Sequence, residues 1–146
     1  MVVAEKRVEA YADKQNYRTM ELVTKADYDK FVKMHSSVLI ENQEVPIGRK
    51  WTIDRFGPSK DYKPETQTVW SFPNRGDWVT HAGDYRGNWS PFIPRNLIER
   101  YTKPGEWVLD QMVGSGTTAI ECKLLGRQGK FVDINPNAIM VTQDRL

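Results

Sequence analysis

The stretch WVLDQMVGSGTT, residues 107–118, is the most informative part of the sequence for the fold. A short apolar run, Trp107 to Leu109, ends in Asp110 and is followed by a turn of glycine, serine and threonine. Residues 119–125 then repeat apolar side chains at a helical period. An apolar run, a glycine turn and a helical period in this order predict a strand, a tight loop and a helix, one βα unit of an α/β sheet.

The glycine loop of this unit predicts a ligand site. Glycine lets the backbone turn sharply and approach a ligand, and the free N–H groups at a helix start can face polar ligand atoms. A phosphate-binding P-loop needs a lysine after Gly116, and the sequence has none there. A dinucleotide fingerprint needs a third glycine at the position of Ala119, where alanine is only tolerated. The third class of ligand is S-adenosylmethionine, whose methionine end is a zwitterion and whose ribose carries two hydroxyls.

An acidic residue at the end of the next strand suits those ribose hydroxyls, as it does in dinucleotide folds. Residues 130–132, Lys-Phe-Val, predict that strand, and Asp133 follows it. The interval from Asp110 to Asp133 is about one βα repeat, close to the roughly 20 residues expected for such a carboxylate. Asp133 is therefore a candidate ribose ligand.

These residues carry a resemblance to a known family. The segment DQMVGSGTT, residues 110–118, is similar to the cofactor motif of the amino-methylating DNA methyltransferases, which make N6-methyladenine or N4-methylcytosine. Gln111 and Met112 stand where that family usually has Pro-Phe. Three more segments resemble the family, so that the resemblance extends from Val69 to Leu146: ECKLLGR at 121–127, VDINP at 132–136, and NWSPFIPRNLI at 88–98, which is similar to the segment that closes over the methionine end of the cofactor.

The resemblance implies an α/β fold, a partial Rossmann-like class I methyltransferase domain with a mixed N-terminal segment. It implies S-adenosylmethionine as cofactor, DNA as partner, a place in restriction-modification and no need for a metal. The cofactor-binding residues that it implies are Asp110, Val113, Gly114, Ser115, Gly116, Thr117, Thr118, Asp133, Ile134, Pro91 and Ile93.

Simpler structural roles stay open for several of these residues. Asp110 could only cap the glycine turn. Thr117 and Thr118 could cap the helix that follows, and Asp133 could cap a helix beginning near Pro136. Cys122 lies on the apolar face of its helix and is expected in the core.

The catalytic residue is not identified by the sequence. The family carries its chemistry on a short loop, Asp/Asn/Ser-Pro-Pro-aromatic, whose ring stacks on a base flipped from the duplex. Ser90-Pro91-Phe92 lacks one proline of that loop, and no Pro-Pro pair occurs in the chain. We therefore expect the isolated chain to be inactive, its loop coming from a partner subunit or lost by truncation. The alternative is an inactive regulatory module that binds S-adenosylmethionine.

A third hypothesis is a DNA-contacting accessory protein, based on a mixed basic and aromatic region. Such a mixture can bind phosphates and stack on bases. The simpler interpretation is a solvated surface, because Asp54, Asp61 and Glu65 dilute the charge. The region contains Arg49, Lys50, Arg55, Lys60 and Lys63, interleaved with Trp51, Phe56 and Tyr62.

Composition limits the class of protein. The chain has 146 residues, 39% hydrophobic and 27% charged, with a net charge of +2. This is the profile of one soluble domain, compatible with nucleic acid but far less basic than a DNA-coating protein. A single cysteine excludes an internal disulfide, and no apolar stretch approaches the ~18 residues of a membrane span. A cytoplasmic protein without a membrane segment is expected, with residues 1–65 and 66–146 as its two regions.

The remaining segments give weaker expectations. Residues 1–23 indicate a weak helix or a frayed arm, and Thr24 can cap a helix whose apolar face holds Tyr28, Phe31, Val32 and Met34. Strands are expected at 38–40 and 66–72, an irregular segment at 46–64, and helices from Pro94 to Tyr101, with Leu97 and Ile98 inward, and from Pro136 onward.

The sheet also predicts assembly. The strand at Leu109 is expected to be buried on both faces, as central parallel strands are. The sequence supplies a neighbour on the side of Phe131 and Val132, and either residues 66–72 or another chain must cover the other side. A homodimer or a second methyltransferase subunit is the expected partner.

Overall fold

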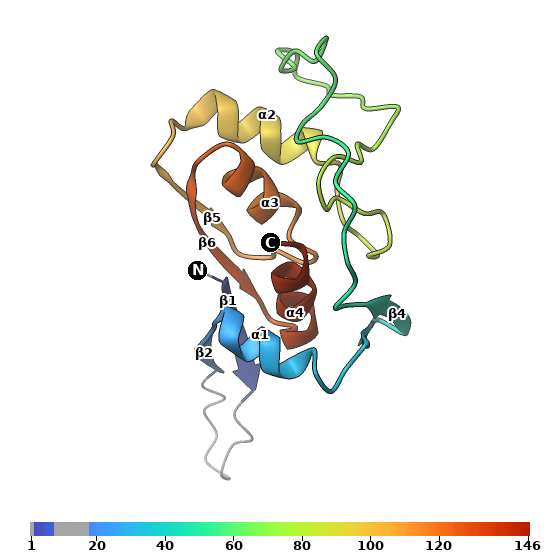
Figure 1. Cartoon of the computed structure of the whole chain (residues 1–146). Helices are drawn as coiled ribbons and strands as arrows, with labels where there is room; N and C mark the ends of the chain where they lie inside the picture. Colours follow the sequence, from blue (N-terminus) through green and yellow to red (C-terminus); the bar gives the residue numbers. More distant parts are fainter. Residues whose placement is uncertain (1, 8–17) are drawn as a thin grey trace.

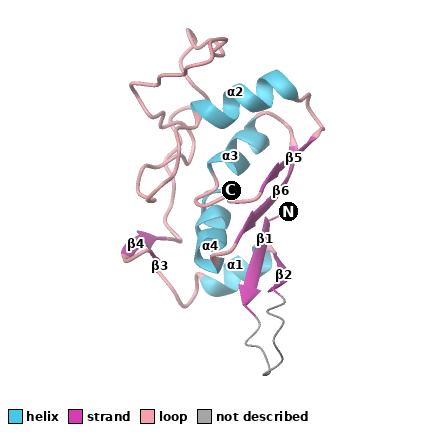
Figure 2. Cartoon of the chain, turned by 180° about the vertical axis from the view of Figure 1, so that it is seen from behind, coloured by secondary structure: helices cyan, strands magenta, loops and turns pink. Residues whose placement is uncertain are grey.

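The computed structural model describes residues 2–7 and 18–146, and it stacks three layers (Figure 1). A four-stranded sheet forms the first layer, with the helices packed on one of its faces (Figure 2). The long segment 48–91 crosses the outside of the helices, away from the sheet. The helices are α1 (Lys25–Phe31), α2 (Phe92–Tyr101), α3 (Thr117–Leu124) and α4 (Pro136–Arg145).

The sheet has the order β2-β1-β6-β5. β6 pairs in parallel with both β1 and β5, and β1 pairs antiparallel with β2. A separate hairpin, β3 (Ser37–Ile40) with β4 (Gln43–Pro46), packs near α4. The sheet strands are β1 (Val2–Arg7), β2 (Arg18–Val23), β5 (Trp107–Asp110) and β6 (Gln128–Asp133).

The βα unit predicted from residues 107–118 is confirmed, since β5, the glycine loop, α3 and β6 follow one another. The molecule is therefore α/β in class. The strand at 38–40 and the helix from Pro136 are confirmed as well. Thr24 caps α1 as expected, in a reciprocal capping box with Asp27. Among the described residues, no helix is both long and apolar enough to cross a membrane.

Two apolar clusters hold the layers together. The first joins the sheet to α2, α3 and α4 through Ile98, Cys122, Phe131 and Ile139. Cys122 is in the core as expected, and burial raises the pKa of its thiol to about 12. The second cluster joins the β3–β4 hairpin to α4 through Val38, Ile40, Val45, Ile47 and Val141.

The expectation of a helix or arm over residues 1–23 is wrong where the chain is described. Residues 2–7 and 18–23 form β1 and β2, while residue 1 and residues 8–17 lie outside the described part. β1 pairs with the free side of β6, from Val2 opposite Phe131 to Ala4 opposite Asp133. Pairing with a distant strand therefore decides the conformation here. Residues on both sides of the expected boundary at 65/66 share this sheet, and that boundary stays a prediction.

The strand expected over Thr66–Phe72 is also wrong. This segment has no regular structure, and its aromatic residues cover α2 instead of pairing in a sheet. The ring of Phe72 stacks on that of Phe92, with centroids 5.2 Å apart. Trp70 Nε1 donates to the carbonyl oxygen of Gln67, which closes a local turn.

Burial at three predicted core positions differs from expectation. Leu109 was expected to be buried on both faces, yet its side chain is 59% exposed because β5 is an edge strand with helices on only one face. Leu97 is exposed as well, whereas its neighbour Ile98 in α2 is buried. Met34 is also exposed, whereas Tyr28 in α1 is buried. Helix α1 ends at Phe31, before Met34, and α2 buries a narrower face than the sequence indicates.

Candidate functional site

The glycine loop lies at the carboxyl ends of β5 and β6, where open parallel sheets bind their ligands. A cavity of about 330 Å³ opens there, between the loop and the segment 85–89. Its volume lies within the range of small-molecule sites. The cavity is lined by Tyr85, Gly87, Asn88, Trp89, Asp110, Met112, Val113, Gly114, Ser115 and Thr117.

Two glycines give the loop its shape. Gly114 and Gly116 have φ values of +54° and +88°, a region that L side chains rarely adopt. Gly116 is the N-cap of α3, and a Cβ on it would lie 3.1 Å from Cγ2 of Thr142. A Cβ on Gly114 would contact the ring of Tyr85 at 3.4 Å. The loop is therefore packed tightly against α4 on one side and against Tyr85 on the other.

Asp110 caps the glycine turn, which is one of the two roles that the sequence left open. Its Oδ1 accepts a hydrogen bond from the backbone N–H of Met112, with 2.9 Å between the heavy atoms. This is the turn-capping contact of an aspartate with the residue two positions later. Asp110 also lines the cavity, so its carboxylate is placed to meet a ligand. Cofactor binding by Asp110 stays a prediction.

Asp133 lies behind the loop and is half-buried. Its Oδ2 accepts from the N–H of Gly114 and its Oδ1 from that of Asn135, each at 2.8 Å. The N-cap of α4 is Asn135, whose side chain accepts from the N–H of Asn137. The helix-cap alternative for Asp133 is therefore wrong, and its contact with ribose stays a prediction.

The far wall of the cavity comes from the long segment before α2, and the sequence did not identify its residues as ligands. Burial, and next the negative charge of Asp133, raise the pKa of Tyr85 to about 12. Tyr85 is therefore a neutral phenol that can donate a hydrogen bond. Trp89 is partly exposed and adds an aromatic surface. Asn88 and Trp89 begin the segment 88–98, which resembles the methyltransferase family. That resemblance was the sequence signal that could have identified them as residues of the site.

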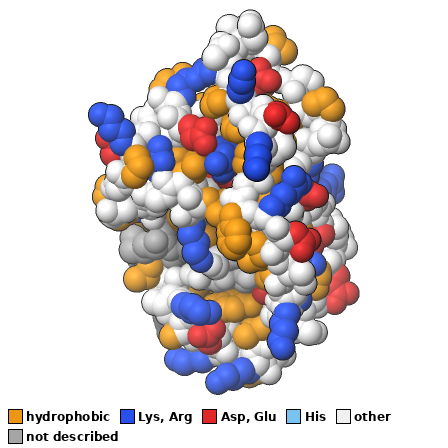
Figure 3. Space-filling model, turned by 45° about the horizontal axis from the view of Figure 1, so that its top comes forward, with side chains coloured by type: hydrophobic (Ala, Val, Ile, Leu, Met, Phe, Trp, Pro, Cys, Tyr) orange, Lys and Arg blue, Asp and Glu red, His pale blue; other side chains and the backbone are white. Residues whose placement is uncertain are grey.

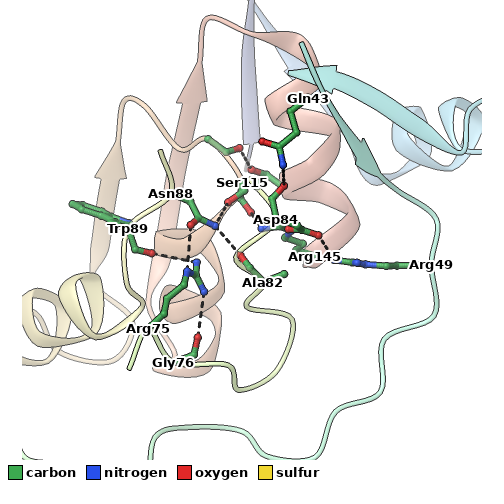
Figure 4. A network of polar contacts seen from close by, with 12 residues as sticks. Gln43, Arg49, Arg75, Gly76, Ala82, Asp84, Asn88, Trp89, Ser115 and Arg145 are labelled. Atoms are coloured by element: carbon green, nitrogen blue, oxygen red, sulfur yellow. Dashed lines mark hydrogen bonds and ion pairs between the residues drawn. The ribbon is translucent and has the colours of Figure 1, made fainter. Parts of the chain in front are cut away.

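A network of polar contacts fixes this wall to the glycine loop (Figure 4). Asn88 Nδ2 donates to Ser115 Oγ at 3.2 Å and to the carbonyl oxygen of Ala82 at 2.8 Å. Arg75 Nε donates to Asn88 Oδ1 at 3.2 Å, and Arg75 Nη2 donates to the carbonyl oxygen of Trp89 at 3.2 Å. The side chain of Ser115 is thereby attached to the segment that faces it across the cavity.

A second set of contacts in the same network centres on Asp84. Its carboxylate pairs with Arg49 at 2.8 Å and with Arg145, whose side chain is almost fully buried. Arg145 Nη1 lies 3.5 Å from the carbonyl oxygen of Ser115. The C-terminal end of α4 therefore holds both the glycine loop and the opposite wall, as Figure 4 shows.

The structure brings together only some of the eleven positions that the resemblance implied. Asp110, Val113, Gly114, Ser115 and Thr117 line the cavity. The other positions are not among the lining residues, and their contact with a cofactor stays a prediction. Thr118 is buried behind the loop, Pro91 is fully buried, Ile93 is partly buried in α2, and Ile134 is largely exposed after β6.

The alternative role of the two threonines as helix caps is not what the structure shows. The N-cap of α3 is Gly116, and no side chain caps that end. Thr117 lies in the first turn and lines the cavity, whereas the buried Oγ1 of Thr118 has no hydrogen-bond partner among the residues that the structure describes.

Ser90 forms two hydrogen bonds within its own region of the chain. Its Oγ donates to the carbonyl oxygen of Arg75 at 2.6 Å and accepts from the N–H of Phe92 at 3.3 Å. The hydroxyl therefore connects the start of α2 to the turn at residue 75. This geometry agrees with the interpretation of Ser90-Pro91-Phe92 as part of the closing segment and not as a catalytic loop.

A buried polar cluster anchors the long segment to α3. The carboxylate of Glu121 is fully buried and accepts from Trp78 Nε1, His81 Nε2 and Arg95 Nη1 at 2.7, 2.7 and 2.8 Å. Burial lowers the pKa of His81, so its ring is neutral near pH 7 with the proton on Nε2. Arg95 supplies the compensating charge, as a buried carboxylate requires.

The mixed basic and aromatic region, residues 49–63, is largely occupied by its own contacts. The guanidinium of Arg49 lies 3.8 Å from the ring centre of Trp51, and the hydroxyl of Tyr62 donates to Asn96 Oδ1 at 2.7 Å. Arg55 pairs with Asp77, while Phe56 is exposed. Basic and acidic side chains are interspersed over the face drawn in Figure 3. The solvated-surface interpretation fits most of this region.

Comparison with known proteins adds a family and several partial relatives. The family described as DNA methylase matches residues 4–144. The chain is 35% identical over 65 residues to the Type II methyltransferase M.XycI of Xanthomonas campestris pv. cyanopsidis, which is 44% of this chain and 22% of that protein. It is 31% identical over 80 residues to the Type II methyltransferase M.Cfr9I of Citrobacter freundii, which is 55% of this chain and 25% of that protein.

A relative of another kind is the ribosomal protein L11 methyltransferase of Staphylococcus carnosus. It is 44% identical over 50 residues, which is 34% of this chain and 16% of that protein. The matched part of the chain thus spans a quarter or less of each of these three relatives. No solved structure matches the chain significantly.

Proposed function

We propose that this chain, which belongs to the DNA methylase family, binds S-adenosylmethionine in the glycine-loop cavity. In this proposal the chain is the cofactor-binding part of a site-specific DNA methyltransferase that methylates adenine N6 or cytosine N4. Its domain is a partial Rossmann-like methyltransferase domain. The same proposal includes a cytoplasmic location and a role in restriction-modification. The role is suggested by the relatives that are named Type II methyltransferases.

The observation that carries the proposal is the position and make-up of the cavity. It lies beyond the carboxyl ends of two parallel strands, at the loop and helix start where the resemblance to methyltransferases is strongest. The relatives include Type II methyltransferases and a ribosomal protein methyltransferase. A methyl donor is the ligand that such enzymes have in common, which favours the cofactor over the methylated substrate as the ligand of this segment.

The lining residues fit the proposed cofactor. The backbone of Gly114 and Ser115 can approach the methionine end closely, because no side chain stands on Gly114. Asp110 offers a carboxylate to an ammonium or hydroxyl group, and Tyr85 offers a neutral O–H. Met112, Val113 and Trp89 supply apolar walls for an adenine ring.

S-adenosylmethionine would supply an electrophilic methyl group on its sulfonium. The residues of this chain would bind and orient it and exclude water from it, which are the contributions that an in-line displacement needs most. The base amine and the loop that holds it would come from elsewhere, a partner subunit or a further segment. The alternative function, a regulatory module that binds the cofactor without turnover, uses the same cavity.

Calorimetry tests the proposal directly. We expect the purified chain to bind S-adenosylmethionine and its demethylated product S-adenosylhomocysteine, and to show no heat of binding with NAD⁺. Binding of NAD⁺ alone would mean that the glycine loop serves a dinucleotide after all. A folded chain that binds none of the three would refute the proposal.

Repeating the titration in the presence of a candidate catalytic subunit separates the leading function from the alternative. A split enzyme gains tritiated-methyl transfer to DNA when the two chains are mixed. A regulatory module binds the cofactor equally well and gains no transfer.

A further inference from the structure

A second cavity lies in the long segment before α2, and it shares no lining residue with the glycine-loop cavity. Its volume is about 590 Å³. Its polar wall consists of two arginines, one aspartate, one asparagine, one serine and a buried histidine, and its apolar wall includes Phe92. The residues on which the inference rests are Arg55, Ser59, Asn74, Arg75, Asp77 and Phe92.

Arg75 brings a positive charge to this wall, and no carboxylate of residues 2–7 or 18–146 forms an ion pair with it. Within the described part of the chain its guanidinium donates to three neutral acceptors, namely Asn88 Oδ1 and the carbonyl oxygens of Gly76 and Trp89, each at 3.2 Å. The side chain is half-buried. Burial, and then the charge of Arg145, lower the pKa of Arg75, so its cation is poorly compensated in its surroundings.

The nearest carboxylate that could neutralise Arg75 is already shared. Asp84 raises the pKa of Arg75 electrostatically, but it pairs directly with Arg49 and Arg145. Three arginines therefore surround one aspartate, which leaves an excess of positive charge beside the cavity. An anion entering the cavity would be attracted by this excess.

The rest of the wall offers further donors. Arg55 pairs with Asp77 in a half-exposed contact, which is weak enough to leave its other N–H groups available. Ser59 and Asn74 are exposed and carry a hydroxyl and an amide. Gly76 has φ +92°, and a Cβ there would lie 2.6 Å from the ring of Trp78, so the wall at this point is bare backbone.

We propose that this cavity binds a phosphate group of a nucleic acid strand, with Arg75 and Arg55 as charged donors and Ser59 and Asn74 as neutral donors. Guanidinium groups bind phosphate oxygens in pairs, and hydroxyl and amide side chains commonly add to such contacts. Phe92 gives the adjoining sugar an apolar surface. The class of ligand, a phosphate ester, follows from the cavity, and the choice of DNA as its source rests on the proposed function.

The test measures binding of a fluorescent DNA duplex and of its single strand by anisotropy, with the full chain. Arg55→Gln removes a charged donor, and Asn74→Asp places a carboxylate in the wall. Each change should weaken binding about tenfold, the scale of a lost charged hydrogen bond. The slope of log affinity against log salt should become shallower by about one for Arg55→Gln, as for one lost phosphate contact.

Lys60→Gln is the matched control, because Lys60 is exposed in the same loop and does not line the cavity. It removes the same charge and should change the affinity by less than about twofold. The proposal is overturned if Arg55→Gln and Asn74→Asp bind DNA as tightly as wild type. It is also overturned if the control Lys60→Gln loses as much DNA affinity as these two variants. Wild type that binds no DNA would also overturn it. Circular dichroism confirms that each variant is folded.

Inorganic phosphate and adenosine monophosphate, titrated by NMR, distinguish a free phosphate ester from a strand. Should both variants lose these ligands while DNA affinity is unchanged, the site takes free phosphate esters and the assignment to nucleic acid is wrong. Calorimetry with S-adenosylmethionine on the same variants should be unaffected, since neither residue lines the other cavity. If wild type binds DNA through this cavity but does not bind S-adenosylmethionine, the proposed function is refuted and the phosphate site is not.

Discussion

The carboxylate of Asp133 accepts a hydrogen bond from the backbone N–H of Gly114, with 2.8 Å between Oδ2 and N. Its other oxygen accepts from the N–H of Asn135 at the start of α4. One side chain thus joins the glycine loop to the helix that follows β6. Asp133 does not line the glycine-loop cavity, but each carboxylate oxygen can accept more than one hydrogen bond, so acceptor capacity remains for a ribose hydroxyl that reaches it.

Replacing Asp133 separates its two roles. Asp133→Ala should weaken binding of S-adenosylmethionine by about 1–3 kcal/mol, because the ribose hydroxyls lose a charged acceptor and the loop loses an anchor. Asp133→Asn keeps an amide oxygen for the N–H of Gly114 and should lose less thermal stability than alanine. Calorimetry and thermal melts measure the two effects. Unchanged affinity in a folded Asp133→Ala variant would remove Asp133 from the cofactor site.

Gly116→Ala tests how tightly the loop packs on α4. The new Cβ would adopt a φ near +88° and lie within 3.3 Å of three atoms of Thr142, one of them its Cα. We expect a loss of about 1–3 kcal/mol in the free energy of unfolding, measured with urea. Gly105→Ala is the control, because Gly105 has φ +86° and no atom within 4 Å of the added Cβ. Equal losses in both variants would mean that backbone strain alone accounts for the effect.

The parts of the fold that the sequence predicted are those encoded over short distances. β5, the glycine loop, α3 and β6 follow one another within residues 107–133, and each has its own pattern of apolar residues or glycines. The capping box of Thr24 is local as well. By contrast, β1 is a strand because it pairs with β6 at the other end of the chain. No pattern within residues 2–7 specifies that partner.

The candidate site divides in the same way. Asp110 and the loop residues 113–117 were predicted from a contiguous motif, and most of them line the cavity. Asn88 was not predicted, because its position depends on contacts with Ser115 and Arg75. Tyr85 was not, because it packs against the apolar cluster that joins the β3–β4 hairpin to α4. The composition of residues 66–72 favoured a strand, but its aromatic residues pack on α2. Whether such a segment pairs in a sheet or packs on a helix depends on its tertiary contacts.

The buried His81 should make stability depend on pH. Burial lowers its pKa in the folded state below the ordinary value of 6.5. Between these two values the unfolded chain binds more protons than the folded one, so the free energy of unfolding falls as the pH falls below about 6.5. A single group contributes at most about 1.4 kcal/mol for each pH unit.

Urea unfolding at pH 7.5 and pH 5.5 measures this dependence. His81→Gln keeps a donor for Glu121 and cannot take up a proton in this range, so its stability should change less between the two pH values than that of wild type. His35, exposed on the surface, remains in both proteins and does not affect the difference between them. Identical pH dependence in the two proteins would show that His81 is not the titrating group.

Methyl transfer by the chain alone should be absent. No Pro-Pro pair occurs in the sequence, and the hydroxyl of Ser90 is engaged with Arg75 and Phe92 at the start of α2. Tritiated methyl groups from S-adenosylmethionine should therefore not appear in DNA incubated with the purified chain. Incorporation that disappears in Ser90→Ala would show that this serine segment is catalytic in spite of its missing proline.

The face of the sheet opposite the helices predicts assembly. Leu109, Lys130 and Val132 lie on that face, and Leu22 lies on it further along, as the strand registers require. Leu109 and Leu22 are 59% and 53% exposed, and Trp107 and Met20 are exposed beside them. Figure 2 shows no helix over this side. Apolar side chains gathered on one exposed face are typical of an interface.

We therefore expect the purified chain to form a dimer, to bind a second subunit or to be poorly soluble. β5, at the edge of the sheet, adds backbone groups that can pair with another strand. The double change Leu109→Lys and Leu22→Lys should shift the chain toward monomer in sedimentation, because two charges would have to be buried at the interface. Val69→Lys is the control, since Val69 is 81% exposed and belongs to the segment 48–91, which runs outside the helices and away from the sheet (Figure 1). A stable wild-type monomer at micromolar concentration would contradict the expectation, and it would mean that the open face tolerates water as it stands.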